Sequence, residues 1–165
     1  MGYIGKDVSE EKGGHMSLRT IKIRLLNADD FDSVVGIDEK VLKRTRLEYY
    51  ELKFDKLFRS QDFLPISLVA EKEDGTVVGF VLGELFMSED GAFPEETTLD
   101  TIVVDPDYQH MGIGEQLMNE FIDHLRKVGV RKINTLVNPN DTQLMNFFLS
   151  NKFSPTKNIS LARSL

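Results

Sequence analysis

The chain has 165 residues, 41% of them hydrophobic and 28% charged, and its formal net charge of −7 argues against a nucleic-acid partner, which would require a concentrated basic surface. It contains no cysteine, which excludes disulfides and thiolate metal sites, and no apolar stretch approaches the roughly 20 residues of a membrane helix. We therefore expect a cytoplasmic protein without metal, membrane or nucleic-acid partners.

The first part of the chain predicts a tail, a strand and two helices. Residues 1–18 lack periodicity and carry Gly13-Gly14-His15 before a second methionine, so we interpret them as a flexible tail that could include vector-derived residues, and 19–165 as a single domain. Apolar and polar residues alternate over 20–26, which predicts a half-buried strand. Asn27 and Asp29 offer N-cap oxygens to a helix that begins near residue 30, and 46–58 predicts a second helix.

The middle of the chain predicts a meander of strands. Residues 66–71 and 77–87 have strand patterns and are joined by a Glu73-Asp74-Gly75 turn. The second of these strands is apolar on both faces, which predicts a central position in the sheet. Residues 97–104 predict the next strand.

The last part predicts a strand–helix–strand crossover and a closing helix. Residues 114–128 form an amphipathic pattern that Gly129 is well placed to end, and 132–137 predict a strand parallel to 97–104. A helix over 141–150 and a short strand over 159–162 complete the pattern. The predicted fold class is α+β (mixed α/β).

A glycine-containing turn connects the strand 97–104 to the helix 114–128. Gly112 and Gly114 allow close approach of a ligand, and the unpaired N–H groups of the helix's first turn favour an anion. A dinucleotide fingerprint requires glycine where this chain has Leu117, and a triphosphate loop requires lysine where it has Glu115. The turn alone therefore predicts either an anion site or a simple packing of helix against sheet.

The wider pattern Val104-x-x-x-Tyr108-Gln109-x-x-Gly112-x-Gly114 resembles the acetyl-CoA signature of the GNAT superfamily of N-acetyltransferases, Gln/Arg-x-x-Gly-x-Gly/Ala. The order of elements from Ile21 onward is similar to that of the family, and the stretch 141–153 looks like its second motif. The resemblance implies the GNAT fold, a central mixed sheet flanked by helices. It also implies acetyl-CoA as cosubstrate and direct attack by a primary amine through a tetrahedral intermediate.

The resemblance also assigns the cofactor contacts by position. The backbone of Ile102, Val103 and Val104 would pair with the pantetheine arm, and one N–H there would polarise the thioester carbonyl. The other implied contacts are Gln109, His110, Met111, Gly112, Ile113 and Gly114 at the pyrophosphate, and Asn140, Phe147 and Phe148 at the thiol end.

Two carboxylates are candidate general bases for the acceptor amine. Glu84 interrupts an otherwise apolar strand, and Asp100 is predicted on the same strand face as Ile102 and Val104. The alternative for each is a strand-end or solvent-facing acid. If Glu84 is the base, Glu84→Gln should strongly lower turnover near neutral pH.

The sequence departs from the family at the proton donor. Phe148 stands where many members have a tyrosine that protonates the departing thiolate, and Lys152 stands where glycine is usual. Tyr108 or a water could serve instead, the thiolate could leave unassisted, or catalysis could be lost. The last case is the alternative function, a non-catalytic acyl-CoA-binding sensor or interaction module.

The acceptor amine, whether of a small molecule, a protein or a peptide, is not identified by the sequence. The helices spanning residues 30–58 would form its wall, through Arg44, Arg46, Tyr49, Tyr50 and Glu51. A homodimer is an expectation that rests only on family members often being dimers.

Overall fold

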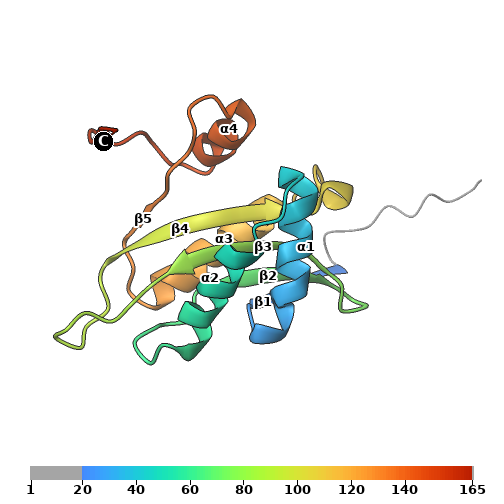
Figure 1. The fold of residues 1–165 in the computed structure, drawn as a ribbon, viewed down its shortest axis with the longest axis horizontal. Helices are drawn as coiled ribbons and strands as arrows, with labels where there is room; N and C mark the ends of the chain where they lie inside the picture. Colours follow the sequence, from blue (N-terminus) through green and yellow to red (C-terminus); the bar gives the residue numbers. More distant parts are fainter. Residues whose placement is uncertain (1–19, 165) are drawn as a thin grey trace, which may run out of the picture.

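The computed structural model describes residues 20–164, so the predicted tail over 1–18 lies outside the described residues and stays a prediction. The described part forms a five-stranded sheet in the order β1-β2-β3-β4-β5 with helices on both faces (Figure 1). Its strands are β1 (Ile21–Leu25), β2 (Leu68–Lys72), β3 (Val77–Glu84), β4 (Glu96–Val104) and β5 (Lys132–Asn134). Its helices are α1 (Phe31–Leu42), α2 (Leu47–Arg59), α3 (Ile113–Lys127) and α4 (Thr142–Ser150), with 3-10 turns η2 (Ala28–Asp30) and η3 (Pro106–Tyr108).

The sheet is mixed, as the sequence predicts. Strands β1 to β4 form an antiparallel meander, and β5 returns after α3 to pair in parallel with β4. The strand β3 is central and buried along its whole length except at Glu84, its last residue. Both the central position of this strand and the parallel crossover are therefore confirmed.

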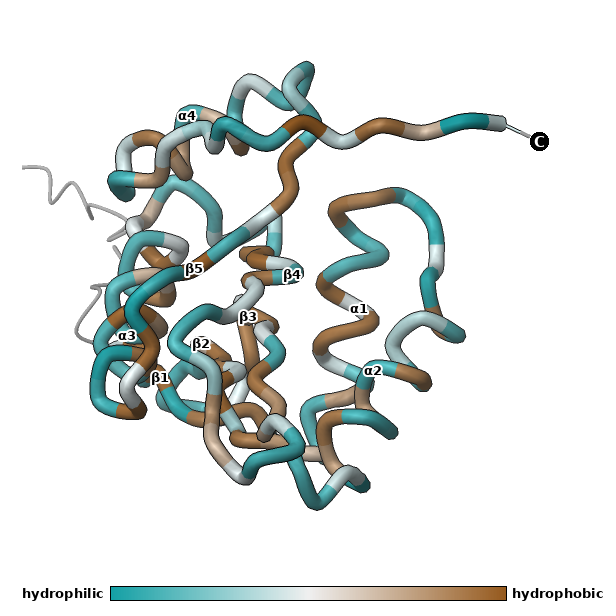
Figure 2. Tube along the Cα trace, turned by 90° about the vertical axis from the view of Figure 1, so that its left-hand side faces the viewer, coloured by the Kyte–Doolittle hydropathy of each residue, from teal (hydrophilic) through white to brown (hydrophobic). Residues whose placement is uncertain are grey.

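Figure 2 shows α3 on one side of the sheet and α1 and α2 on the other, and each face of the sheet has its own buried core. On one face, α3 packs through Leu117, Phe121 and Leu125. On the other, α1 and α2 pack against β3 through residues such as Tyr50 and Phe54. Each sheet face thus covers its apolar side chains with amphipathic helices, as a layered fold requires. No helix between residues 20 and 164 is long and apolar enough to cross a bilayer.

Local signals explain where two helices begin and end. The Asn27 side chain accepts the Asp29 N–H, and the Asp30 carboxylate accepts the Asn27 N–H in return, a reciprocal cap just ahead of α1. Just after the C-terminal end of α3, Gly129 adopts a φ of 92°, which glycine takes without strain. The Val130 N–H then donates to the Leu125 carbonyl.

The predicted strand over 159–162 is wrong. This part of the chain has no strand neighbour, and Ile159 and Leu161 are 81% and 87% exposed. Alternating residues suit a half-buried pleated surface, but here no sheet edge receives them. The strand predicted over 132–137 is also shorter, because β5 stops pairing after Asn134.

A bulge in β4 changes which way Asp100 points. Leu82 pairs with Thr101 and Gly83 with Leu99, so the register skips Asp100. An extra residue in one strand reverses the alternation of faces beyond it. As a result Ile102 packs into the α3-side core, whereas Asp100 contacts α2 on the opposite side. The predicted common face of Asp100 with Ile102 and Val104 is therefore wrong.

Candidate active site

A cleft of about 690 Å³ opens where β5 separates from β4. One wall is β4 from Leu99 to Val104, and the other is formed by α4 and the residues after β5. The turn before α3 and the C-terminal end of α1 also line the cleft. Its volume falls within the range of small-molecule and cofactor sites.

The separation of β5 leaves the outer edge of β4 without a strand partner. Strand β5 pairs only with residues 96–98 of β4. Just beyond, the Thr135 hydroxyl donates to the Leu99 carbonyl at 2.9 Å, and the two segments then diverge. Figure 1 shows β5 leaving β4 in the direction of α4. An open strand edge can accept an extended ligand through main-chain hydrogen bonds, as another strand would.

The chain leaves β4 through a fixed turn at Asp105. Its N–H donates to the Val78 carbonyl at 2.8 Å, which ties the turn to β3. Its buried carboxylate accepts hydrogen bonds from the Asp107 N–H at 3.0 Å and from Lys40 Nζ at 2.6 Å. The Gln109 amide then donates back to the Val104 carbonyl at 3.0 Å. These contacts hold the turn in place beside the start of α3.

The first turn of α3 presents free N–H groups to the cleft. Gly112 precedes the helix with a φ of 82°, and no side chain caps this end. The Gln116 N–H donates to the Gly112 carbonyl at 3.0 Å and begins the helical bonding pattern, so the N–H groups of the three preceding residues remain at the free end. A Cβ at Gly114 would meet its nearest neighbour, the Phe147 ring, at an ordinary 3.5 Å. The protein's own packing therefore does not require glycine at this position.

Both candidate bases are held by one buried lysine. Lys53, on α2, is 8% exposed, and its Nζ donates to Glu84 Oε1 and to Asp100 Oδ2. Lys56 donates to the second oxygen of Glu84 at 2.9 Å. Asp100 lines the cleft, whereas Glu84 is not among the lining residues.

The charges of this cluster are mutually stabilised. Burial alone would raise the pKa of Glu84, but hydrogen bonds from Lys53 and Lys56 outweigh it and hold that pKa below its ordinary value. Burial alone would likewise lower the pKa of Lys53, but the bonds to Asp100 and Glu84 raise it. The lysine is therefore a fixed cation at neutral pH, and Glu84 is a weak base.

A second ion pair forms the wall on the α1–α2 side. Arg46 donates to both oxygens of buried Asp38, at 2.8 and 2.6 Å, and its guanidinium lies 4.8 Å from the Tyr49 ring centre. Arg44 and Arg46 line the cleft, as expected of this wall. Tyr49, Tyr50 and Glu51 do not line it: Tyr50 is fully buried, and Glu51 faces the opposite side of α2.

Comparison with known proteins identifies the family of this chain. The model described as the Acetyltransferase (GNAT) family matches residues 34–153, or 120 of the 165 residues. The chain belongs to the GNAT acetyltransferase family.

Individual relatives agree with this assignment. A curated GNAT protein, the ribosomal protein bS18-alanine N-acetyltransferase of Escherichia coli (strain K12), is 36% identical over 58 residues, 35% of this chain and 34% of that protein. The chain thus matches about a third of the length of this relative. The solved structure of the Escherichia coli S18-alanine enzyme has a TM-score of 0.67 at 21% identity, covering 83% of this chain and 79% of that one. An aminoglycoside N-acetyltransferase in complex with CoA has a TM-score of 0.70 at 16% identity, covering 87% and 94%. The predicted GNAT fold is confirmed.

The structure brings together most of the residues that the GNAT resemblance assigns to coenzyme A. Met111 and Asn140 do not line the cleft: Met111 is 40% exposed, and the Asn140 N–H donates to Asn138 Oδ1 in the loop before α4. The assigned residues that do line it are Ile102, Val103, Val104, Gln109, His110, Gly112, Ile113, Gly114, Phe147 and Phe148.

The α4 side of the cleft carries phenylalanine rings where many GNAT proteins have a tyrosine hydroxyl. Phe148 is buried, and its ring lies 5.6 Å from that of Phe147 and 5.0 Å from that of Phe153. Tyr108 lines the cleft as well, but its ring lies 5.6 Å from Lys72 Nζ. No proton-donating side chain therefore stands at the position on α4 where the family often has a tyrosine.

Sequence reasoning missed Lys53 and the wall after β5. Lys53 lies at helical spacing among Tyr50, Phe54 and Leu57, all of them buried, and a lysine inside such a stripe could have signalled a buried ion pair. Thr135 gave no comparable signal, because its place in the cleft depends on where β5 stops pairing.

Proposed function

We propose that this protein is an acetyl-CoA-dependent N-acetyltransferase that acetylates a primary amine by direct attack on the thioester. The observation that carries the proposal is the cleft, where an open strand edge, a free helix N-terminus and an ion-paired carboxylate meet. A relative in the same family is named as an N-acetyltransferase, and a structure with the same fold contains CoA. Both support the choice of acetyl donor.

Coenzyme A fits the cleft by its chemistry. The free N–H groups at the start of α3 and the helix dipole suit a pyrophosphate. The open edge of β4 at Ile102, Val103 and Val104 suits the amide-containing pantetheine arm, which can pair with main-chain groups. Phe147 and Phe148 give the thiol end an apolar wall.

Asp100 is the favoured base. It faces the cleft from the bulge in β4, whereas both oxygens of Glu84 bind lysines behind it. Asp100 would take the amine proton through a water while the nitrogen forms its bond to the acetyl carbon. An unpaired backbone N–H of the bulge would stabilise the resulting oxyanion, a contribution of about 2.7–4 kcal/mol in other enzymes.

Collapse of the tetrahedral intermediate then breaks the carbon–sulfur bond. The thiolate takes its proton from water or Tyr108. A thiol with a pKa of about 8.5 loses its proton at pH 7 for roughly 2 kcal/mol, so departure without the family's tyrosine is feasible.

The free energy needed to present the acceptor amine as neutral depends on the pKa of that amine. A lysine-like amine, with a pKa of about 10.4, costs roughly 4.6 kcal/mol to present as neutral at pH 7. A peptide α-amine, with a pKa near 8, costs only about 1 kcal/mol. We therefore favour an α-amino acceptor over a lysine-like one.

The test is release of free thiol from acetyl-CoA with a panel of peptides, amino acids, polyamines and aminoglycosides. We expect acceptor-dependent release, fastest with peptide N-termini. The alternative function, an acyl-CoA sensor, is favoured by Phe148 in place of a proton-donating tyrosine. Tight binding of acetyl-CoA without acceptor-dependent release across the panel would establish the sensor and contradict the enzyme.

A further inference from the structure

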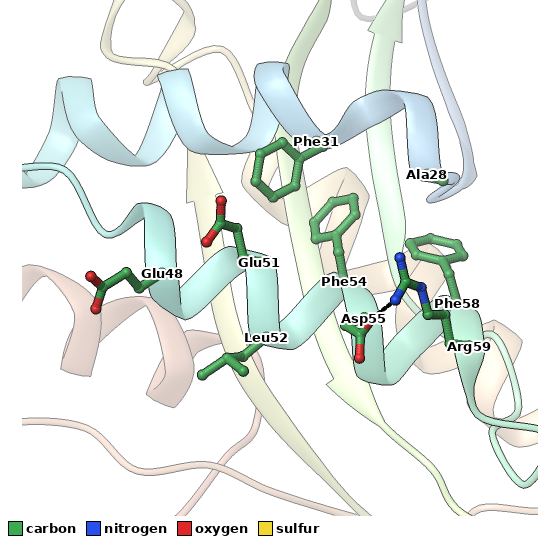
Figure 3. A pocket seen from close by; sticks show the side chains of 9 residues that line it. All are labelled: Ala28, Phe31, Glu48, Glu51, Leu52, Phe54, Asp55, Phe58 and Arg59. Atoms are coloured by element: carbon green, nitrogen blue, oxygen red, sulfur yellow. Dashed lines mark ion pairs between the residues drawn. The ribbon is translucent and has the colours of Figure 1, made fainter.

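A second hollow of about 700 Å³ lies on the outer side of α1 and α2, away from the sheet (Figure 3). We call it the α1–α2 groove. Its floor is aromatic: Phe54 packs edge-on against Phe31 at 5.1 Å and lies 5.4 Å from Phe58. Phe58 is 41% exposed, and Leu52 on the rim is 74% exposed. Clustered exposed apolar side chains of this kind mark surfaces that contact other molecules.

The rim of the groove is acidic. Glu48 and Glu51 are exposed and form no ion pair with any residue between 20 and 164. Asp55, one turn further along α2, is paired with Arg59 at 2.8 Å. Two uncompensated carboxylates beside an apolar floor select an occupant that carries both basic and apolar side chains.

The groove and the cleft share one helix. Arg46 lines the cleft immediately before α2 begins, and Glu48 lines the groove two residues later. Lys53 reaches inward from the same helix to Asp100, whereas Leu52 lies on the groove side. A helix of 13 residues is about 20 Å long, the span of roughly six residues of extended chain.

We propose that the α1–α2 groove binds the segment that follows the acceptor amine, so that the acceptor is a polypeptide N-terminus with a basic and apolar segment a short distance downstream. This inference rests on the proposed acetyltransferase function and names its substrate class. A small polyamine does not explain the groove, because it carries no apolar side chain to cover the aromatic floor. A second copy of this chain is a poor occupant, because each copy carries a net charge of −7.

The experiment compares two peptides with the same N-terminus. One ends after four residues, and the other continues for twelve more with alternating lysine and leucine. For wild type we expect a lower KM for the long peptide at similar kcat. Glu51→Lys should raise the KM for the long peptide roughly three- to tenfold, because it replaces attraction by repulsion at the rim. The KM for the short peptide should stay the same.

Glu120→Lys is the matched control. Glu120 is exposed on α3, on the other face of the sheet, and the substitution changes the net charge equally. We expect it to leave the KM of both peptides unchanged. Equal KM values for the two peptides in wild type, or equal effects of Glu120→Lys and Glu51→Lys, would overturn the proposal.

Binding measured without turnover separates this proposal from the proposed function. The long peptide, acetylated at its N-terminus and carrying a fluorophore at its C-terminus, cannot react, and its anisotropy reports docking alone. Weaker docking to Glu51→Lys supports the groove even if no acceptor is acetylated. Docking that Glu51→Lys does not change refutes the groove even if acetylation occurs. A wild-type dimer in light scattering that Leu52→Glu dissociates would show that a second copy occupies the groove.

Discussion

Lys53 lies between Glu84 and Asp100 on the side of α2 that faces the sheet, and its charge decides what both carboxylates can do. Without this ammonium the two carboxylates would repel each other. The ammonium between them offsets this repulsion, and its hydrogen bond helps to lower the pKa of Glu84, which makes Glu84 a weaker base. Lys53 therefore fixes Asp100 in position at the cleft and neutralises much of the charge of Glu84.

Replacing Lys53 by methionine keeps most of the stem and removes the cation. We expect the free energy of unfolding to fall by about 1–3 kcal/mol at pH 7, because charged acceptors lose a hydrogen-bond donor. In wild type the lowered pKa of Glu84 contributes stability above its ordinary value of 4.5, and this is lost as the pH falls through the folded-state pKa. The difference in the free energy of unfolding between wild type and Lys53→Met should therefore become smaller below about pH 4.5. Urea unfolding of both proteins at pH 7 and at pH 4 measures it.

The control is Lys56→Met, which removes a half-exposed lysine from the same carboxylate. It should change stability little at either pH, because exposed pairs contribute little. A Lys53→Met deficit that is the same at both pH values would mean that only packing was lost.

Asp100→Asn tests the base. We expect kcat/KM to fall about 10²-fold, the usual contribution of a general base, while calorimetry shows unchanged coenzyme A affinity. Glu84→Gln should lower kcat/KM less, because Glu84 faces two lysines rather than the cleft. A larger loss of kcat/KM in Glu84→Gln than in Asp100→Asn would instead identify Glu84 as the base, the other candidate that the sequence offers.

At the scale of elements, the turn between β4 and α3 aims the N–H groups of the helix into the cleft. It depends on the positive φ of Gly112, a conformation that costs other residues about 1–2 kcal/mol. His110 also adopts a positive φ of 61°, so the turn is tightly wound on both sides of Met111.

Gly112→Ala should displace these N–H groups. We expect the KM for acetyl-CoA to rise about tenfold, as loss of one charge-assisted hydrogen bond would produce, with little change in kcat at saturation. Gly75→Ala is the matched control, because Gly75 has a φ of 86° in the β2–β3 turn. Gly75→Ala should introduce similar backbone strain but leave the KM for acetyl-CoA unchanged. An unchanged KM in Gly112→Ala would remove this turn from the donor site.

Elements with strong periodicity could be predicted from the sequence, and those that depend on a neighbour could not. The helix α3 and the central strand β3 follow from the spacing of their apolar residues. The alternation over 159–162 was equally regular, but a strand also needs a free edge beside it. The bulge at Asp100 left no mark in the residue pattern, because it arises from the pairing of two strands.

The same division holds for the site. The turn between β4 and α3 is continuous in the sequence, so its glycines and its place before the helix could be predicted. Its role in binding a phosphate stays a prediction. The opposite wall of the cleft comes from residues after β5 and from α4, and the hydrogen bond from Lys53 to Asp100 joins residues 47 apart. Only the folded chain brings these segments together.

At the scale of the whole molecule, the cleft lies between β4 on one side and α4 with the residues after β5 on the other, so a ligand in it would contact both. A ligand that binds only the folded state at 100 times its Kd adds about 2.7 kcal/mol, which for a domain of this size raises Tm by roughly 5–10 °C. We expect this shift with coenzyme A in differential scanning fluorimetry. NAD should give no comparable shift, because Leu117 occupies the third glycine position of a dinucleotide turn. A shift with NAD that persists when coenzyme A is added would identify a different ligand.

The separation of β5 from β4 also affects how prone the protein is to aggregation and proteolysis in a cell. An uncovered strand edge is where one chain recruits another into aggregates, and most proteins shield such edges with charge or with a covering segment. Here the outer edge of β4 beyond residue 98 has no strand beside it. If coenzyme A lies along that edge, the cosubstrate also serves as its shield. The abundance of the protein would then follow the coenzyme A supply, because starved cells would hold more of it in the form open to self-association and proteolysis.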